Sequence, residues 1–109
     1  MSNPTIITDE NIKGLVKSYL KNKSELPSDL IYVPIGDWDV SNVTDMSKLF
    51  SDMELLNESL NNWNVSNVTN MSLMFTRCTS FNQPLDKWNV SNVTNMDGMF
   101  FFVENLIHH

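Results

Sequence analysis

The sequence predicts an α/β repeat solenoid, in which each coil of 25 residues combines a short helix with a short parallel strand, behind an N-terminal capping helix. The first observation is the string WNVSNVTNM, which occurs at 63–71 and again without change at 88–96. A near copy, WDVSNVTDM, occupies 38–46. Self-similarity at a fixed period of about 20–50 residues indicates stacked repeats, whose units bury their apolar faces against one another.

The second observation is that apolar positions beyond the copied string keep the same step along the chain. These positions include Met46, Met71 and Met96, then Leu49, Met74 and Met99, then Phe50, Phe75 and Phe100. Because side chains of similar shape pack closely when their units stack, we expect each set to form a continuous column inside the protein.

The N-terminal element is predicted to be an amphipathic helix over residues 8–21. Its apolar face follows the i, i+3, i+4, i+7, i+8 spacing of one helix side and consists of Ile12, Leu15, Val16, Tyr19 and Leu20. Thr8 can cap the helix, and Asp9 is favourable in the first turn. The segment has no counterpart in the repeats. We expect it to cover the apolar end of the first coil, since stacked repeats need end caps.

Each coil is predicted to hold a short helix followed by a short strand. The helix is indicated by apolar residues spaced 3, 3, 1 and 3 apart, namely Val68, Met71, Met74, Phe75 and Cys78. The strand is indicated by Trp88 and Val90, which alternate with polar residues. We therefore divide the chain into residues 1–36, a capping helix with its connector, and residues 37–109. The second part holds three coils starting at Trp38, Trp63 and Trp88, the last one incomplete.

The longer string W-[DN]-V-S-N-V-T-[DN]-M-x-x-[ML]-F, with FNQPL at 81–85, resembles the BspA-like leucine-rich-repeat surface proteins. This family includes mycoplasma-type lipoproteins and is also found in giant viruses. The resemblance covers about residues 36–104. It implies a leucine-rich-repeat-like solenoid that binds proteins, often at a cell surface, and it implies no enzymatic activity. The N-terminal residues lack a signal-peptide pattern, so the location is unknown, and the sequence as written indicates an intracellular protein.

The charge distribution and composition argue against several classes of function. The net charge is −6, and the acidic excess lies on the repeats, which disfavours binding to nucleic acid through clustered basic residues. No apolar run approaches the roughly 20 residues that a membrane-spanning helix needs. The single cysteine, Cys78, occupies an apolar repeat position and is interpreted as packing. Without a core histidine to act as a general base, we predict no enzymatic activity and no cofactor.

A metal site is not expected either. The only histidines, His108 and His109, form a terminal pair that we interpret as a tail or tag remnant. A calcium-binding β-roll needs glycine-rich turns, whereas this chain has 3 glycines without a common period.

The first candidate binding surface is the outward side of the predicted strands. Its polar residues differ between coils, as is typical of repeat proteins that build extended binding surfaces. They are Asp37, Asp39, Asn62, Asn64, Lys87 and Asn89. The alternative is that these residues only keep the sheet soluble.

The second candidate is an apolar interface at the C-terminal end. Phe101 and Phe102 stand where earlier repeats have polar residues, and Leu106 and Ile107 follow. An exposed apolar patch usually marks an interface, so we expect a second copy of the chain or another protein of unknown identity to bind here. The predicted function is a non-enzymatic protein–protein interaction module, with a surface or adhesion role as one form of it. The alternative is a structural or degenerate fragment of a longer repeat array without a partner of its own.

Overall fold

A computed structural model describes residues 3–103 of the chain, which contain three short helices. The α-helix α1 spans Ile12–Lys21 and is followed by two 3₁₀ helices, η1 at Lys23–Glu25 and η2 at Ile35–Asp37. β-Pairing among the described residues is limited to two isolated parallel bridges, Asp45 with Asn70 and Asn70 with Asn95. Most of the chain therefore consists of turns and extended connections.

The spacing predicted that the helix begins at residue 8, but α1 begins at Ile12. The backbone carbonyl of Thr8 accepts a hydrogen bond from the N–H of Ile12, with a donor–acceptor distance of 3.0 Å. The Asp9 carboxylate does not serve the first turn of the helix but binds Thr44 in the repeats. The helix buries Ile12, Val16 and Tyr19.

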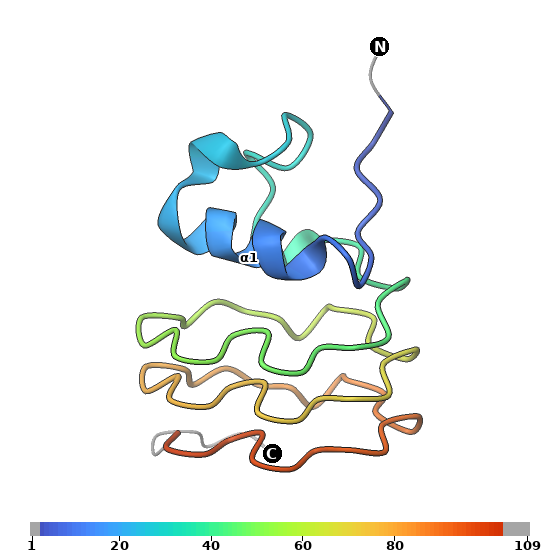
Figure 1. The fold of residues 1–109 in the computed structure, drawn as a ribbon, viewed down its shortest axis with the longest axis vertical. Coiled ribbons are helices and arrows are strands. Elements are labelled where there is room, and N and C mark those ends of the chain that lie inside the picture. The colour runs from blue at the N-terminus through green and yellow to red at the C-terminus, as the bar shows by residue number, and fades with distance from the viewer. Residues whose placement is uncertain (1–2, 104–109) are drawn as a thin grey trace.

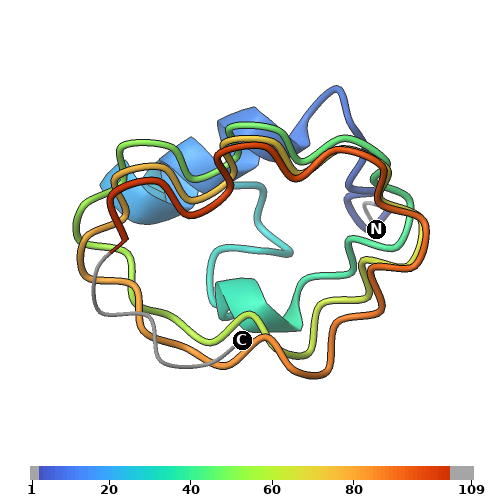
Figure 2. The ribbon, with the colours of Figure 1, turned by 90° about the horizontal axis from the view of Figure 1, so that it is seen from below.

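The three repeats lie one on another beneath α1 (Figure 1). We call them layer 1 (38–62), layer 2 (63–87) and layer 3 (88–103). Seen along the stack, layers 1 and 2 follow nearly the same closed path, and the described part of layer 3 follows the corresponding part of it (Figure 2). In each layer, a segment that we call the turn arc (46–53, 71–78 and 96–103) contacts the neighbouring layer through backbone hydrogen bonds.

The prediction of a leucine-rich-repeat-like α/β solenoid, with a short helix and a short parallel strand in each coil, is wrong. Neither element forms within the repeats over residues 38–103. The segment predicted as a helix, such as 68–78, contains the turn arc, which consists of consecutive turns. In layer 1 the N–H of Leu49 bonds to the carbonyl of Met46, and the N–H of Met53 bonds to the carbonyl of Phe50.

Backbone dihedral angles explain why the turn arc is not helical. Each turn places its third residue in the left-handed region, as type II turns do. In layer 1 these residues are Lys48, with φ 59°, and Asp52, with φ 65°. The equivalent residues of the other layers are also left-handed: Leu73, Arg77, Gly98 and Phe102. A right-handed helix cannot pass through such residues, so apolar spacing of three and four arises here from turns.

The acceptors of the backbone N–H groups also distinguish the turn arc from a helix. The N–H groups of Met46, Lys48, Phe50 and Asp52 donate to carbonyls of layer 2, at donor–acceptor distances of 2.7–2.9 Å. Every second N–H therefore bonds to the next layer instead of to the carbonyl four residues earlier. Alternate N–H groups of layer 2 donate to carbonyls of layer 3 in the same way.

A column of aromatic rings runs through the interior of the stack. The rings of Phe50 and Phe75 stack with centroids 5.4 Å apart, and those of Phe75 and Phe100 with centroids 5.6 Å apart. The indole N–H groups of Trp63 and Trp88 donate to the carbonyls of Ile35 and Leu60. Trp38, one layer earlier, has no acceptor for its buried indole N–H within residues 3–103.

Candidate functional site

The lower face of layer 3 departs from the burial pattern of the other repeats. Met96 is 43% exposed and Phe100 is 38% exposed, whereas the equivalent methionines and phenylalanines of layers 1 and 2 are fully buried. The difference arises because the described part of the chain has no layer beneath layer 3. The sequence predicted an exposed C-terminal end but did not name Met96 and Phe100 among its residues.

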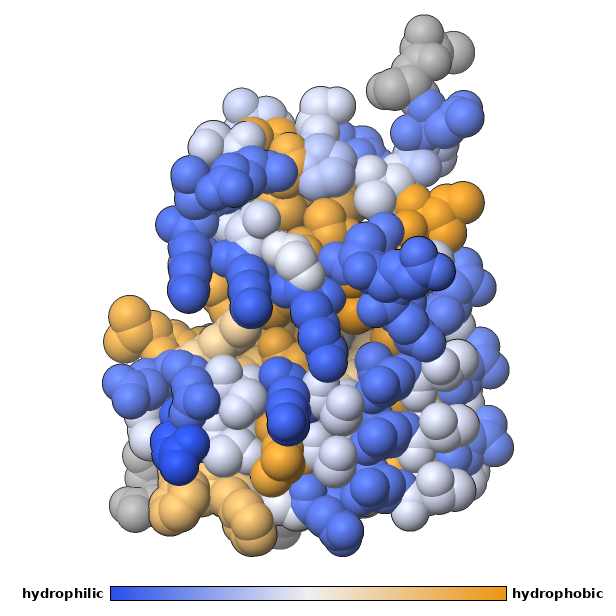
Figure 3. All heavy atoms as spheres, in the orientation of Figure 1, coloured by the Kyte–Doolittle hydropathy of each residue, from blue (hydrophilic) through white to orange (hydrophobic). Residues whose placement is uncertain are grey.

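Phe101 and Phe102 lie beside this face and are 58% and 62% exposed. Their rings contact edge to face at a centroid distance of 6.3 Å, and the guanidinium of Arg77 lies 5.3 Å from the centre of the Phe102 ring. The apolar side chains at the lower end of the molecule interrupt a surface that is largely polar (Figure 3). The other two predicted interface residues, Leu106 and Ile107, lie outside the described residues.

We name the four side chains Met96, Phe100, Phe101 and Phe102 the apolar edge. They belong to one turn arc and expose large apolar groups within seven positions of the chain. Such a group of side chains can bury apolar area against a partner. Its position is fixed by backbone bonds to layer 2, including the bond from the N–H of Arg77 to the carbonyl of Phe101.

The six residues of the predicted polar grid are all exposed, but they do not lie on strands. The side-chain oxygens of Asp39, Asn64 and Asn89 each accept the backbone N–H two residues ahead, at distances of 3.0–3.1 Å. These bonds form Asx turns, and the two hydrogen bonds from Ser41 lower the pKa of Asp39. One column of the grid therefore has a local structural role in each layer.

The other column of the grid is Asp37, Asn62 and Lys87. Asp37 closes η2, and the backbone N–H of Lys87 donates to the side chain of Asn61. No described contact brings the six grid residues together into one binding cluster.

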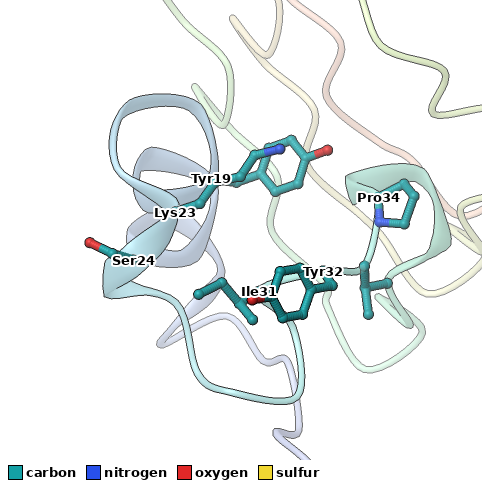
Figure 4. Close-up of a pocket in the computed structure, with 7 residues that line it drawn as sticks. Tyr19, Lys23, Ser24, Ile31, Tyr32 and Pro34 are labelled. Carbon is teal, nitrogen blue, oxygen red and sulfur yellow. The ribbon is translucent and has the colours of Figure 1, made fainter.

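A surface depression of about 470 Å³ lies between α1 and the connector (Figure 4). Its lining includes Tyr19, Lys23, Tyr32 and Pro34. The ammonium of Lys23 lies 4.3 Å from the centre of the Tyr19 ring, and the Tyr19 hydroxyl donates to Glu58. Burial raises the pKa of Tyr19, so the hydroxyl stays protonated at neutral pH. The depression thus combines aromatic walls with one cation that already contacts an aromatic ring.

Cys78 is fully buried, and its thiol donates to the carbonyl of Phe50 at 2.9 Å. Burial raises the pKa of Cys78 to about 11, which keeps the side chain as an unreactive thiol. Within residues 3–103, no three metal-ligating side chains gather into a possible site. In the same part of the chain, no helix has the length and apolar character to cross a membrane.

Asp9 closes the opposite end of the stack. Its carboxylate accepts hydrogen bonds from the N–H and the hydroxyl of Thr44, at 2.7 and 2.6 Å, and from the N–H of Asp45. In layer 2 the equivalent groups of Thr69 both donate to the carbonyl of Thr44. The Asp9 carboxylate therefore occupies the place that a carbonyl of a preceding layer would take.

Replacing Asp9 by asparagine should lower stability at neutral pH and change its pH dependence. Burial alone would raise the pKa of Asp9, but the hydrogen bonds from Thr44 and Asp45 outweigh it and lower the pKa below 3.8. The ionised form thus contributes stability fully above pH 3.8, and this stability is lost as the pH falls through the lower folded-state pKa. We expect Asp9→Asn to cost about 1 kcal/mol at pH 7, a value reduced by solvent exposure.

Urea unfolding of the wild type and of Asp9→Asn at pH 7 and pH 3 measures this effect. The stability gap between the two proteins should narrow at pH 3. An equal gap at both values would show that the Asp9 charge does not stabilise the fold.

Comparison with known proteins gives one family. A family model described as "Mycoplasma protein of unknown function, DUF285" matches residues 17–108, which include the repeats. The match supports a mycoplasma-type repeat family, but it does not support the narrower resemblance to BspA-like leucine-rich-repeat proteins. Neither the curated proteins nor the solved structures give a match.

Proposed function

Because this chain belongs to the DUF285 family of mycoplasma proteins of unknown function, we propose a function from its surfaces: it is a non-enzymatic protein-interaction module that binds its partner through the apolar edge. The observation that carries the proposal is the exposure of Met96 and Phe100, whose equivalents in layers 1 and 2 are fully buried. Leaving such side chains in water forgoes stabilisation that a partner can restore by covering them.

The chemistry of the other candidate sites also supports a binding role. The Cys78 thiol is buried and protonated, and the Asp9 carboxylate is engaged in closing layer 1. A nucleophile or general base needs an accessible side chain with a positioned partner. The exposed apolar groups of layer 3, by contrast, have the character of an interface.

A double substitution, Phe101→Thr with Phe102→Arg, tests the proposal. Layer 2 carries threonine and arginine at the equivalent positions, Thr76 and Arg77, with the same left-handed backbone at the second. The variant should therefore fold while losing apolar surface. Leu55→Ser is the matched control, because Leu55 is 92% exposed and lies outside the apolar edge.

The measurement is affinity capture from a host lysate, followed by identification of the retained proteins and titration of each purified protein. We expect a partner whose affinity falls at least about tenfold in the double variant, equivalent to 1.4 kcal/mol of binding free energy, and is unchanged in Leu55→Ser. A partner that binds the wild type and the double variant equally would place the interface elsewhere. Finding no partner that rebinds as a purified protein would contradict the proposed function.

A further inference from the structure

The turn arc has a hydrogen-bonding polarity that identifies the kind of partner the apolar edge accepts. In layer 2 the N–H groups of alternate residues point to layer 3 and donate to its carbonyls: Met71 to Asn95, Leu73 to Asp97, Phe75 to Met99, and Arg77 to Phe101. Layer 1 donates to layer 2 in the same way. Along the arc, each layer therefore presents N–H donors on its lower side and carbonyl acceptors on its upper side.

The lower side of layer 3 presents this donor row without a described acceptor. The residues equivalent to the layer 2 donors, one 25-residue period further along the chain, are Met96, Gly98, Phe100 and Phe102, so their N–H groups face down. None of the four donates to an acceptor within residues 3–103. The carbonyl of Thr94, equivalent to acceptors at Thr44 and Thr69, likewise receives no hydrogen bond there. The edge thus combines four donors, one acceptor and exposed apolar rings.

This pattern disfavours pairing between two copies of the edge. An N–H group can only donate, so two rows of donors facing each other across a two-fold axis leave both unsatisfied. A head-to-tail pair is disfavoured as well, because α1 covers the upper end of a second copy (Figure 1). The N–H of Thr44 in that copy, which would have to donate to the carbonyl of Thr94, already donates to Asp9. A homodimer, one of the two partners expected from the sequence, would therefore leave this donor row unsatisfied.

We propose that the apolar edge binds a segment of another chain that carries one further copy of this 25-residue repeat, taken up as an additional layer. The inference rests on the proposed interaction function and specifies the partner. Such a segment supplies carbonyls at every second residue, as Asn95, Asp97, Met99 and Phe101 do for layer 2. Its phenylalanine would stack on Phe100, as Phe100 stacks on Phe75 with rings inclined by only 4°.

A synthetic peptide with the sequence of residues 63–87, carrying Ser in place of Cys78, provides the probe. It is added to the full chain, labelled with ¹⁵N, and amide hydrogen exchange is followed residue by residue. We expect saturable binding that slows exchange at the amides of Met96, Gly98, Phe100 and Phe102 by at least about tenfold, because these groups gain acceptors. A peptide with aspartate in place of Met71 and Phe75 keeps the backbone but loses the apolar column, and it should not bind.

Three outcomes overturn the inference. The first is unchanged exchange at the four amides with the peptide at millimolar concentration, and the second is equal binding of the aspartate peptide. The third is a dimer of the chain alone in light scattering that becomes monomeric in the Phe101→Thr, Phe102→Arg variant. In that third case the apolar edge is an interface but its partner is a second copy.

The two proposals fail separately. If the repeat peptide does not bind while a purified partner from the capture experiment binds through the apolar edge, the interaction function stands and the repeat-bearing partner is wrong. If neither the repeat peptide nor a purified partner binds, both proposals are wrong.

Discussion

Phe75→Ala is expected to lower the free energy of unfolding by about 3–5 kcal/mol, the range for truncating a buried aromatic side chain. Phe75 is fully buried at the centre of the column. Its ring contacts four others, those of Phe50, Phe81, Trp88 and Phe100, at centroid distances of 4.5–6.3 Å. The substitution removes all four contacts at once and leaves a cavity that joins the three layers.

The control for this prediction is Leu55→Ala. Leu55 is a large apolar residue of the same stack, but it is 92% exposed, so its truncation should change stability by less than about 0.5 kcal/mol. Urea denaturation followed by tryptophan fluorescence measures both variants. Similar losses in the two would show that the aromatic column does not hold the layers together.

Gly36→Ala should also destabilise the fold, by about 1–3 kcal/mol, the range for forcing atoms into a filled site. A Cβ atom at Gly36 would collide with the backbone carbonyl oxygen of Ser59, and its distance to the Ser59 carbonyl carbon would be 3.3 Å. A backbone group cannot move aside as a flexible side chain can. Relief of the clash therefore requires η2 and layer 1 to separate.

Gly14→Ala is the matched control, with an effect of the opposite sign. Gly14 lies within α1, and a Cβ atom there meets nothing within 4 Å. Alanine is the better helix former, so we expect a gain of about 0.5–1 kcal/mol. Thermal unfolding of both variants measures the contrast. A Gly36→Ala protein as stable as the wild type would show that η2 does not pack against Ser59 as the structure has it.

The burial of the repeats could be predicted from the sequence, because burial follows the 25-residue period. Phe50 and Phe75 occupy equivalent positions and are both fully buried. The backbone conformation between these two residues could not be predicted from the sequence. Left-handed turn positions are usually glycine or asparagine, and Gly98 fits that rule, but its equivalents are Lys48 and Leu73. Stacking imposes the turn on residues that do not favour it, and apolar spacing of three and four was therefore mistaken for a helix.

The candidate site was predictable only in part. Phe101 and Phe102 stood out because they replace polar residues of earlier repeats, and the structure places both at the surface. Met96 and Phe100 were missed because their residue types match their buried equivalents; only the position of their layer exposes them. The donor row could not be predicted from the sequence, since it depends on which N–H groups the turns direct along the stack.

Amide hydrogen exchange of the unliganded chain tests the central claim, an unpaired donor edge on layer 3, most directly. The amides of Met71, Leu73, Phe75 and Arg77 donate to layer 3 and should exchange about a hundredfold more slowly than those of Met96, Gly98, Phe100 and Phe102, which lack described acceptors. That result would establish an open edge available to a partner. Equally slow exchange in both sets would show that the edge is already paired, and would contradict the account.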